Sequence, residues 1–461
     1  MGFLYCLINI FIIVCSILAR DDLRILSILG LVQIVYCIIT VQKKSPLKFS
    51  LGVLFLAVLY LFHSGLALLL LQNYTYSEIA SFVPREYYVL AQIFTELSIF
   101  MFPIGYSMGK GKNKPFKQLH LSQVSAHPFL VAFLFCVPFY LLATYIKVRT
   151  GIAEGYAATY LLESHPLFHY GSLFITSAIP LGIILLVFYR RKTRFSRLIA
   201  ISIVIVSVYS MTSGHRITAL VNLIVLSIVY FNIVSELNKK SIILLVLSAV
   251  FFIIFLPMVS TLRTYGNVDK ENINKMYNEM KSGEQEGAVY SGLTEFGGTV
   301  LSLALPIQNS NSSSFNCGLS YLILPFNLSP KLPLDLVESD WYRTSRVFMY
   351  KYSVTKGMSF GGSCLGEAFA NFGWFGWLFF LIVGLIVRMA DNAIGELKNS
   401  GRLSFLTIFM IWQTPNFILW IRSYSYVFVS FTLILLYILW VYSVKEGNKN
   451  YKKSMFLKYE R

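Results

Sequence analysis

Charged residues are scarce in this sequence: Asp, Glu, Lys and Arg make up only 13% of its 461 residues, about half the share that soluble domains carry. Hydrophobic residues make up 56% of it, and they come in runs of roughly 15–23 residues that hold little or no charge. A helix of that length crosses about 30 Å of hydrocarbon. Continuous apolar runs cross a membrane as helices. The composition therefore excludes a soluble protein and predicts an all-α integral membrane protein.

Motifs of soluble enzymes are also lacking. The sequence has no P-loop, nucleophile elbow, HExxH zinc motif or CxxC pair. The nearest paired acids in the long polar segment of the second half are Glu338 and Asp340, a pattern that chance produces easily. We therefore expect no metal site and no cofactor, and an enzyme here would work without them.

Acidic residues are fewer than basic ones, 22 against 39, which gives a formal net charge of +17. Such an excess invites a nucleic-acid interpretation, but the basic residues lie mostly in short loops between apolar runs. No compact basic domain remains to hold a duplex. We expect no nucleic-acid partner and interpret the charge as a signal of membrane topology.

Cysteine is rare, and four of the six cysteines lie in apolar runs, where a thiol behaves as a small hydrophobe. These four are Cys6, Cys15, Cys37 and Cys136. Cys317 and Cys364 lie in the long polar segment, where a disulfide or two free thiols are both compatible with the sequence.

The apolar runs predict about twelve spans. No basic residue precedes the run that begins at Gly2, and no small-residue cleavage site follows it before Arg20, so we expect it to be the first span and not a signal peptide. The first six are Phe3–Ala19, Ile25–Val41, Phe49–Leu71, Tyr88–Met108, Phe129–Ile146 and Leu173–Tyr189. The other six are Leu198–Met211, Ile217–Val234, Ile242–Val259, Trp374–Val387, Leu403–Trp420 and Tyr426–Val441.

Lys and Arg in the short loops predict the orientation, because basic residues near a span resist translocation. One side of the alternation collects the clusters 43–48, 110–117, 190–197, 239–240 and 388–402 and the tail from Lys445, and the other side holds only scattered basic residues. Both termini are therefore expected in the cytoplasm. The predicted organisation is residues 1–260 as nine spans, 261–372 as a large extracytoplasmic loop, 373–443 as three spans and 444–461 as a basic cytoplasmic tail.

Three arginines are predicted at the outer membrane face. Arg216 lies in the turn SGHR, Arg263 follows the ninth span in STLRTYG, and Arg422 ends the eleventh. A guanidinium is permanently charged and binds phosphate oxygens in bidentate fashion, so converging arginines would suit a pyrophosphate at the membrane surface. The alternative is that each one only anchors its helix end.

Two glutamates and a histidine are candidates for acid–base chemistry. Glu295 lies in TEFGGT and Glu367 in GGSCLGEAFANFGWFG, where the predicted outer loop joins the membrane. Either carboxylate could act as a general base or pair with an arginine to shape a site, and the pairing is the interpretation we favour. His215, next to Arg216, titrates near neutrality, although a lone loop histidine is usually only solvated.

The order of these elements resembles the Wzy-type O-antigen polymerases, also called oligosaccharide repeat unit polymerases. The resemblance rests on the GHR turn, the arginine after the ninth span, EFGGTVLSLAL in a long outer loop, and GEAFANFGWFGWLFFLIVGL entering a span. It is clearest between Met211 and Val387. It implies a GT-C-like polytopic glycosyltransferase architecture, with the large loop in the periplasm of a bacterial inner membrane.

The resemblance also implies an activity. Such a protein joins undecaprenyl-pyrophosphate-linked oligosaccharides into O-antigen, among membrane lipids and with a chain-length regulator and a flippase as further partners. It would place Arg216, Arg263 and Arg422 on the pyrophosphate and Glu295, Glu367 and His215 in acid–base or site-shaping roles. Trp341, Tyr342 and Arg343 would contact sugars. A flippase of the same lipids and an O-antigen ligase remain the alternatives.

Overall fold

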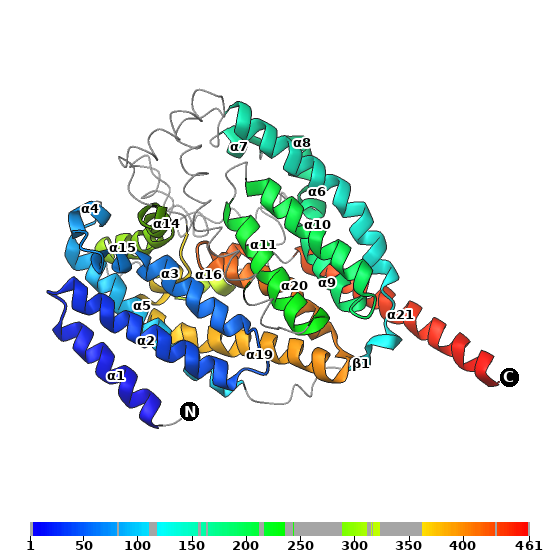
Figure 1. Ribbon diagram of the computed structural model, residues 1–461, viewed down its shortest axis with the longest axis horizontal. Coiled ribbons are helices and arrows are strands. Elements are labelled where there is room, and N and C mark those ends of the chain that lie inside the picture. The colour runs from blue at the N-terminus through cyan, green and yellow to red at the C-terminus, as the bar shows by residue number, and fades with distance from the viewer. Residues whose placement is uncertain are drawn as a thin grey trace. The chain divides into compact units, whose positions relative to one another are not determined.

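The computed structural model describes residues 3–80, 83–109, 118–154, 158–162, 165–211, 216–235, 243, 288–310, 315, 317–322, 362–428 and 431–459. This part of the chain is almost entirely helical (Figure 1). The two strands in it, β1 (Leu119–His120) and β2 (Arg402–Leu403), form one short antiparallel pair. The prediction of an all-α fold is confirmed.

Seven helices in the described residues are long and apolar enough to cross a membrane. They are α2 (Leu23–Lys44), α3 (Leu51–Leu70), α5 (Arg85–Met108), α6 (His127–Ala153), α10 (Thr193–Met211), α11 (Arg216–Val229) with its π-helical continuation Tyr230–Val234, and Cys364–Ser400. Three shorter apolar helices are α1 (Phe3–Leu18), α9 (Ser172–Phe188) and α20 (Phe405–Trp420). The chain is thus a multi-pass membrane protein.

Eleven of the twelve predicted spans overlap a described helix. The predicted ninth span, 242–259, lies outside the described residues except for Ile243, and a helix covers at least part of each of the other eleven. The last of them coincides with α21 (Phe431–Tyr459), which continues well beyond the apolar run. The total of twelve stays a prediction.

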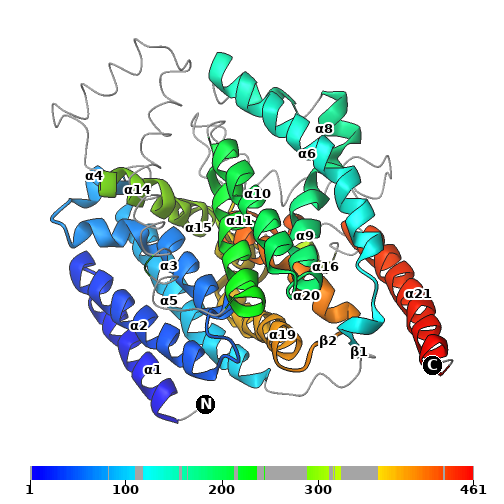
Figure 2. The same cartoon turned by 45° about the vertical axis from the view of Figure 1, so that its right-hand side comes forward.

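The chain divides into two compact units. The first comprises Met1–Lys112, Val289–Asp391 and Asn416–Ser430. In it α1, α2, α3 and α5 pack side by side (Figure 2). The second comprises Asn113–Ala288, Asn392–Pro415 and Phe431–Arg461, and α6, α9, α10 and α11 pack together in it.

Part of the predicted outer loop belongs to the core of the first unit. The chain there forms α14 (Ala288–Gly297), a 3-10 turn (Gly298–Val300) and α15 (Leu301–Gln308). The side chains of α15 are buried from Leu301 to Ile307, and the helix packs on α5 and on α18 (Cys364–Phe372). The apolar stretch 300–306, too short to span, is therefore a buried packing element.

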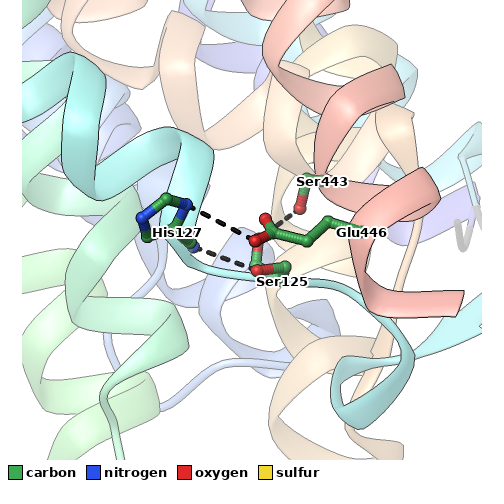
Figure 3. A network of polar contacts seen from close by, with 4 residues as sticks. All are labelled: Ser125, His127, Ser443 and Glu446. Atoms are coloured by element: carbon green, nitrogen blue, oxygen red, sulfur yellow. Dashed lines mark hydrogen bonds and ion pairs between the residues drawn. The ribbon is translucent and has the colours of Figure 1, made fainter. Parts of the chain in front are cut away.

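In the second unit, the start of α6 is joined to α21 by a polar network (Figure 3). His127 Nδ1 lies 3.4 Å from Glu446 Oε1, and Ser125 N donates to the Ser443 carbonyl at 3.0 Å. The Ser443 hydroxyl donates to the Ser125 carbonyl. The side chains of His127 and Glu446 are both exposed, so their contact adds little stability, and the serine pair holds the two segments in register.

Candidate functional site

The structure describes the side chains of two of the nine candidate residues, Glu367 and Arg422. Arg216 begins α11 and Glu295 lies in α14, but their side chains are outside the described part. The remaining candidates also lie outside the described residues: His215, Arg263, Trp341, Tyr342 and Arg343. The site can therefore be built around Glu367 and Arg422, both in the first unit.

Helix α18, which carries Glu367, has a defined start. Ser363 is its N-cap, and its Oγ accepts a hydrogen bond from Gly366 N at 2.9 Å, as expected for a serine at this position. The same Oγ lies 2.8 Å from Nε2 of His63 in α3, and His63 Nδ1 lies 3.1 Å from the Leu59 carbonyl. Because a carbonyl only accepts, Nδ1 carries a proton, and Nε2 of a neutral ring accepts from Ser363. This bond links α18 to α3.

Glu367 is only 5% exposed, and its carboxylate accepts four hydrogen bonds. Trp420 Nε1 and Ser425 N donate to Oε2 at 2.9 and 2.8 Å. The hydroxyls of Ser425 and Ser320 donate to Oε1 at 2.5 and 3.1 Å. All four donors are neutral. The predicted pairing of Glu367 with an arginine is not found among the described residues, where neutral donors satisfy the carboxylate instead.

Arg422 lies in a turn that connects α20 to the 3-10 turn Ser425–Val427. Its guanidinium carbon is 5.6 Å from the centre of the Phe62 ring, a cation–π distance. The backbone of Ser423 packs against Gly362, where an added Cβ would lie 2.7 Å from Ser423 Cα. Trp420 and Ser425 stand at the two ends of this turn, and both donate to Glu367. The turn that carries Arg422 is therefore bonded to the candidate carboxylate at each end.

Aromatic rings surround the same carboxylate. Tyr321 stacks on Phe379 with ring centres 4.3 Å apart, and its ring meets Trp420 edge-on at 6.3 Å. Its hydroxyl oxygen is buried with no hydrogen-bond partner in the described part of the chain. Burial, and then the charge of Glu367, raises the pKa of the Tyr321 phenol well above its usual value. The phenol therefore stays protonated and keeps a donor to offer at neutral pH.

The cysteine pair considered from the sequence is not bonded. Cys364 is buried in α18, Cys317 is exposed, and both thiols are free. A buried thiol in a packed helix behaves as a small hydrophobe. Among the residues that the structure describes, no group of three His, Cys, Asp or Glu is placed to hold a metal ion.

Sequence reasoning missed the partners of Glu367 and the partner of Ser363, the N-cap of its helix. His63 could have been found, because an ionisable residue inside an apolar run marks a functional or structural polar contact. Ser320, Trp420 and Ser425 carried no such signal: their role depends on three segments that tertiary packing brings to one carboxylate.

Comparison with known proteins extends the resemblance seen in the second half to the first. No match was found among curated proteins or among solved structures. A model of the family described as O-antigen polysaccharide polymerase Wzy matches residues 2–450. Since this match spans nearly the whole chain, first half included, the protein belongs to the O-antigen polysaccharide polymerase Wzy family.

Proposed function

We propose that the protein polymerises polyprenyl-pyrophosphate-linked oligosaccharide repeat units into O-antigen at the periplasmic face of the inner membrane, with undecaprenyl as the carrier. A hydroxyl oxygen of a fresh unit attacks the anomeric carbon of the growing glycan. The bond from that carbon to the pyrophosphate breaks, the hydroxyl proton is lost, and the lipid pyrophosphate leaves with the negative charge. The family membership and the Glu367-held turn that carries Arg422 support this proposal.

Charge on the departing pyrophosphate is what the arginines would stabilise. Guanidinium groups aimed at the leaving oxygens would lower the barrier, since preorganised electrostatics usually contribute most to catalysis. We assign Arg422, Arg216 and Arg263 to the pyrophosphate and Glu295 or His215 to the attacking hydroxyl. Trp341, Tyr342 and Arg343 are assigned to the sugars. We expect no metal, because the sequence offers no matched acid pair.

We also propose where the protein lies in the cell and which partners it works with. Both termini would lie in the cytoplasm, and the protein would meet its lipid-linked substrates from the surrounding membrane lipids. A flippase would deliver the units and a chain-length regulator would set the number joined. The alternatives are a flippase, which would place its polar groups near the membrane midplane, and a ligase, which would differ in its acceptor.

Deleting the gene and displaying the surface glycan on a gel tests the proposal. A polymerase predicts a core with a single repeat unit and no ladder. Loss of that single unit as well would contradict the polymerase and favour a flippase or ligase.

Complementation with Arg422→Ala is expected to shorten or abolish the ladder, and Arg422→Lys to restore it only in part, because lysine lacks bidentate geometry. Arg402→Ala, at an exposed residue of β2, is the matched control and should restore it fully.

A further inference from the structure

The turn 421–424 is fixed at both ends by one side chain. We propose that Glu367 is a positioning residue that clamps this turn and so aims Arg422 at the pyrophosphate, and that it does not accept a proton in the reaction. The target of Arg422 rests on the proposed function, whereas the clamp itself rests on geometry alone. Glu367 thereby shapes the site and does not act as its base.

Hydrogen bonding argues against Glu367 as a base. A carboxylate has about four lone-pair sites on its two oxygens, and Glu367 receives four hydrogen bonds, two on each oxygen. A substrate hydroxyl would have to displace one of these donors and leave it buried without a partner, which is unfavourable. The same full set of donors is what a rigid anchor requires.

Geometry links the anchor to the arginine. A single oxygen, Oε2, accepts from both ends of the turn. Its donors are Nε1 of Trp420, the last residue of α20, and the backbone N–H of Ser425, the first residue after the turn. Between them, Ser423 packs against Gly362 and the Arg422 guanidinium lies over Phe62. Since a misplacement of about 1 Å can cost on the order of 100-fold in rate, releasing either end of the turn should weaken whatever Arg422 binds.

Chemical labelling tests the clamp without any activity. The full-length protein in detergent is treated with phenylglyoxal, and modification at Arg422 is followed by mass spectrometry, with the exposed Arg402 as the internal reference. Glu367→Gln should raise the labelling rate of Arg422 by about threefold or more relative to Arg402, because the amide nitrogen of Gln cannot accept from the surrounding donors. Trp420→Phe, which removes one donor, should raise it less. Unchanged labelling in both variants would overturn the clamp.

A double-mutant cycle then separates positioning from proton transfer. With purified protein and lipid-linked repeat units, Glu367→Gln should lower kcat/KM by about tenfold, because a misaligned Arg422 would stabilise the departing pyrophosphate less well. In an Arg422→Ala background the same change should alter KM and kcat by less than about twofold. A further large fall in kcat in that background would identify Glu367 as a base and refute the inference. Absence of polymer from the wild-type protein would refute the proposed function and leave the labelling result to decide on the clamp.

Discussion

Two buried carboxylates among the described residues, Glu367 and Asp391, are satisfied by neutral donors. Asp391, fully buried in α19 (Phe379–Ser400), accepts from the hydroxyls of Ser50 and Tyr106, each at 2.6 Å, and from the backbone N–H groups of Leu51 and Gly52 at 2.9 and 3.2 Å. The last two are orphan donors at the start of α3, where a negative charge also meets the positive end of the helix dipole. Asp391 therefore acts as a cap for α3, supplied by another helix.

Replacing Asp391 with Ala should destabilise the protein by about 3 kcal/mol, because several buried donors would lose their acceptor together. Unfolding of the purified protein in detergent, followed by tryptophan fluorescence, measures the effect. Asp391→Asn keeps one acceptor oxygen and should cost less. Glu396→Ala on the same helix is the matched control, since Glu396 is only half-buried and its carboxylate accepts from Gln118 alone among the bonds described. Equal stability of the Asp391→Ala and Glu396→Ala variants would contradict the capping role.

Single residues with charge in apolar surroundings could be identified from the sequence, but their partners could not. Glu367 and Arg422 stood out because each interrupts an apolar context. That the two are joined through Trp420 and Ser425 depends on how α18 packs against the end of α20, and no local pattern encodes that packing. Asp391 was missed because it follows Arg388 and resembled part of a solvated basic loop.

At the scale of elements, apolar runs located the helices well and their ends poorly. The predicted span 374–387 stops at Arg388, whereas α19 continues to Ser400. Although it is charged, Arg388 is buried, with only 8% of its surface exposed, and its guanidinium carbon lies 5.0 Å from the centre of the Tyr106 ring. Hydropathy falls where charge appears, but a helix continues as long as its backbone bonds are made and its side chains find partners. The helix therefore continues beyond the predicted span, and the end of the span itself stays a prediction.

Helices α5 and α19 cross in backbone contact at two glycines. An added Cβ at Gly105 would lie 1.9 Å from the Leu381 carbonyl oxygen, and one at Gly384 would lie 2.1 Å from that of Phe102. Neither position has room for a methyl group. Close approach at small residues is the usual way in which membrane helices associate, because lipid offers no hydrophobic drive between them.

Gly105→Ala and Gly384→Ala should therefore each lower stability by about 2 kcal/mol, the usual cost of forcing extra atoms into a packed contact. Gly30→Ala in α2 is the matched control: its Cβ would lie 3.4 Å from the nearest atom, an ordinary contact. All three can be compared by unfolding in detergent. If Gly30→Ala destabilised as much as the other two, the close crossing of α5 and α19 would not be the cause, since alanine by itself favours a helix more than glycine does.

At the scale of the whole molecule, the family match over residues 2–450 covers far more of the chain than the motifs that first suggested the family. Those motifs lie mostly in the second half. The first half is a series of apolar helices, and many different apolar sequences can form a membrane-spanning helix, so that half carries little family-specific pattern. Parts of the predicted outer loop pack on α3, α5 and α18, and this packing explains why they appear in the sequence as apolar stretches. The sugar-contacting candidates of that loop lie outside the described residues.

The position of Arg422 relative to the membrane depends on the predicted ninth span, 242–259, because every later helix reverses if that segment does not cross. Basic residues at 239–240 and at 388–402 predict that both flanking loops lie in the cytoplasm and that residues after 261 lie outside. Alkaline phosphatase, which is active only outside the cytoplasm, can be fused after Asn238 and after Val268. We expect activity only from the second fusion. Activity from neither fusion would remove the ninth span, place Arg422 on the cytoplasmic face and exclude it from a periplasmic pyrophosphate site. Activity from both would also remove that span, but it would leave Arg422 outside and place the N-terminus there as well.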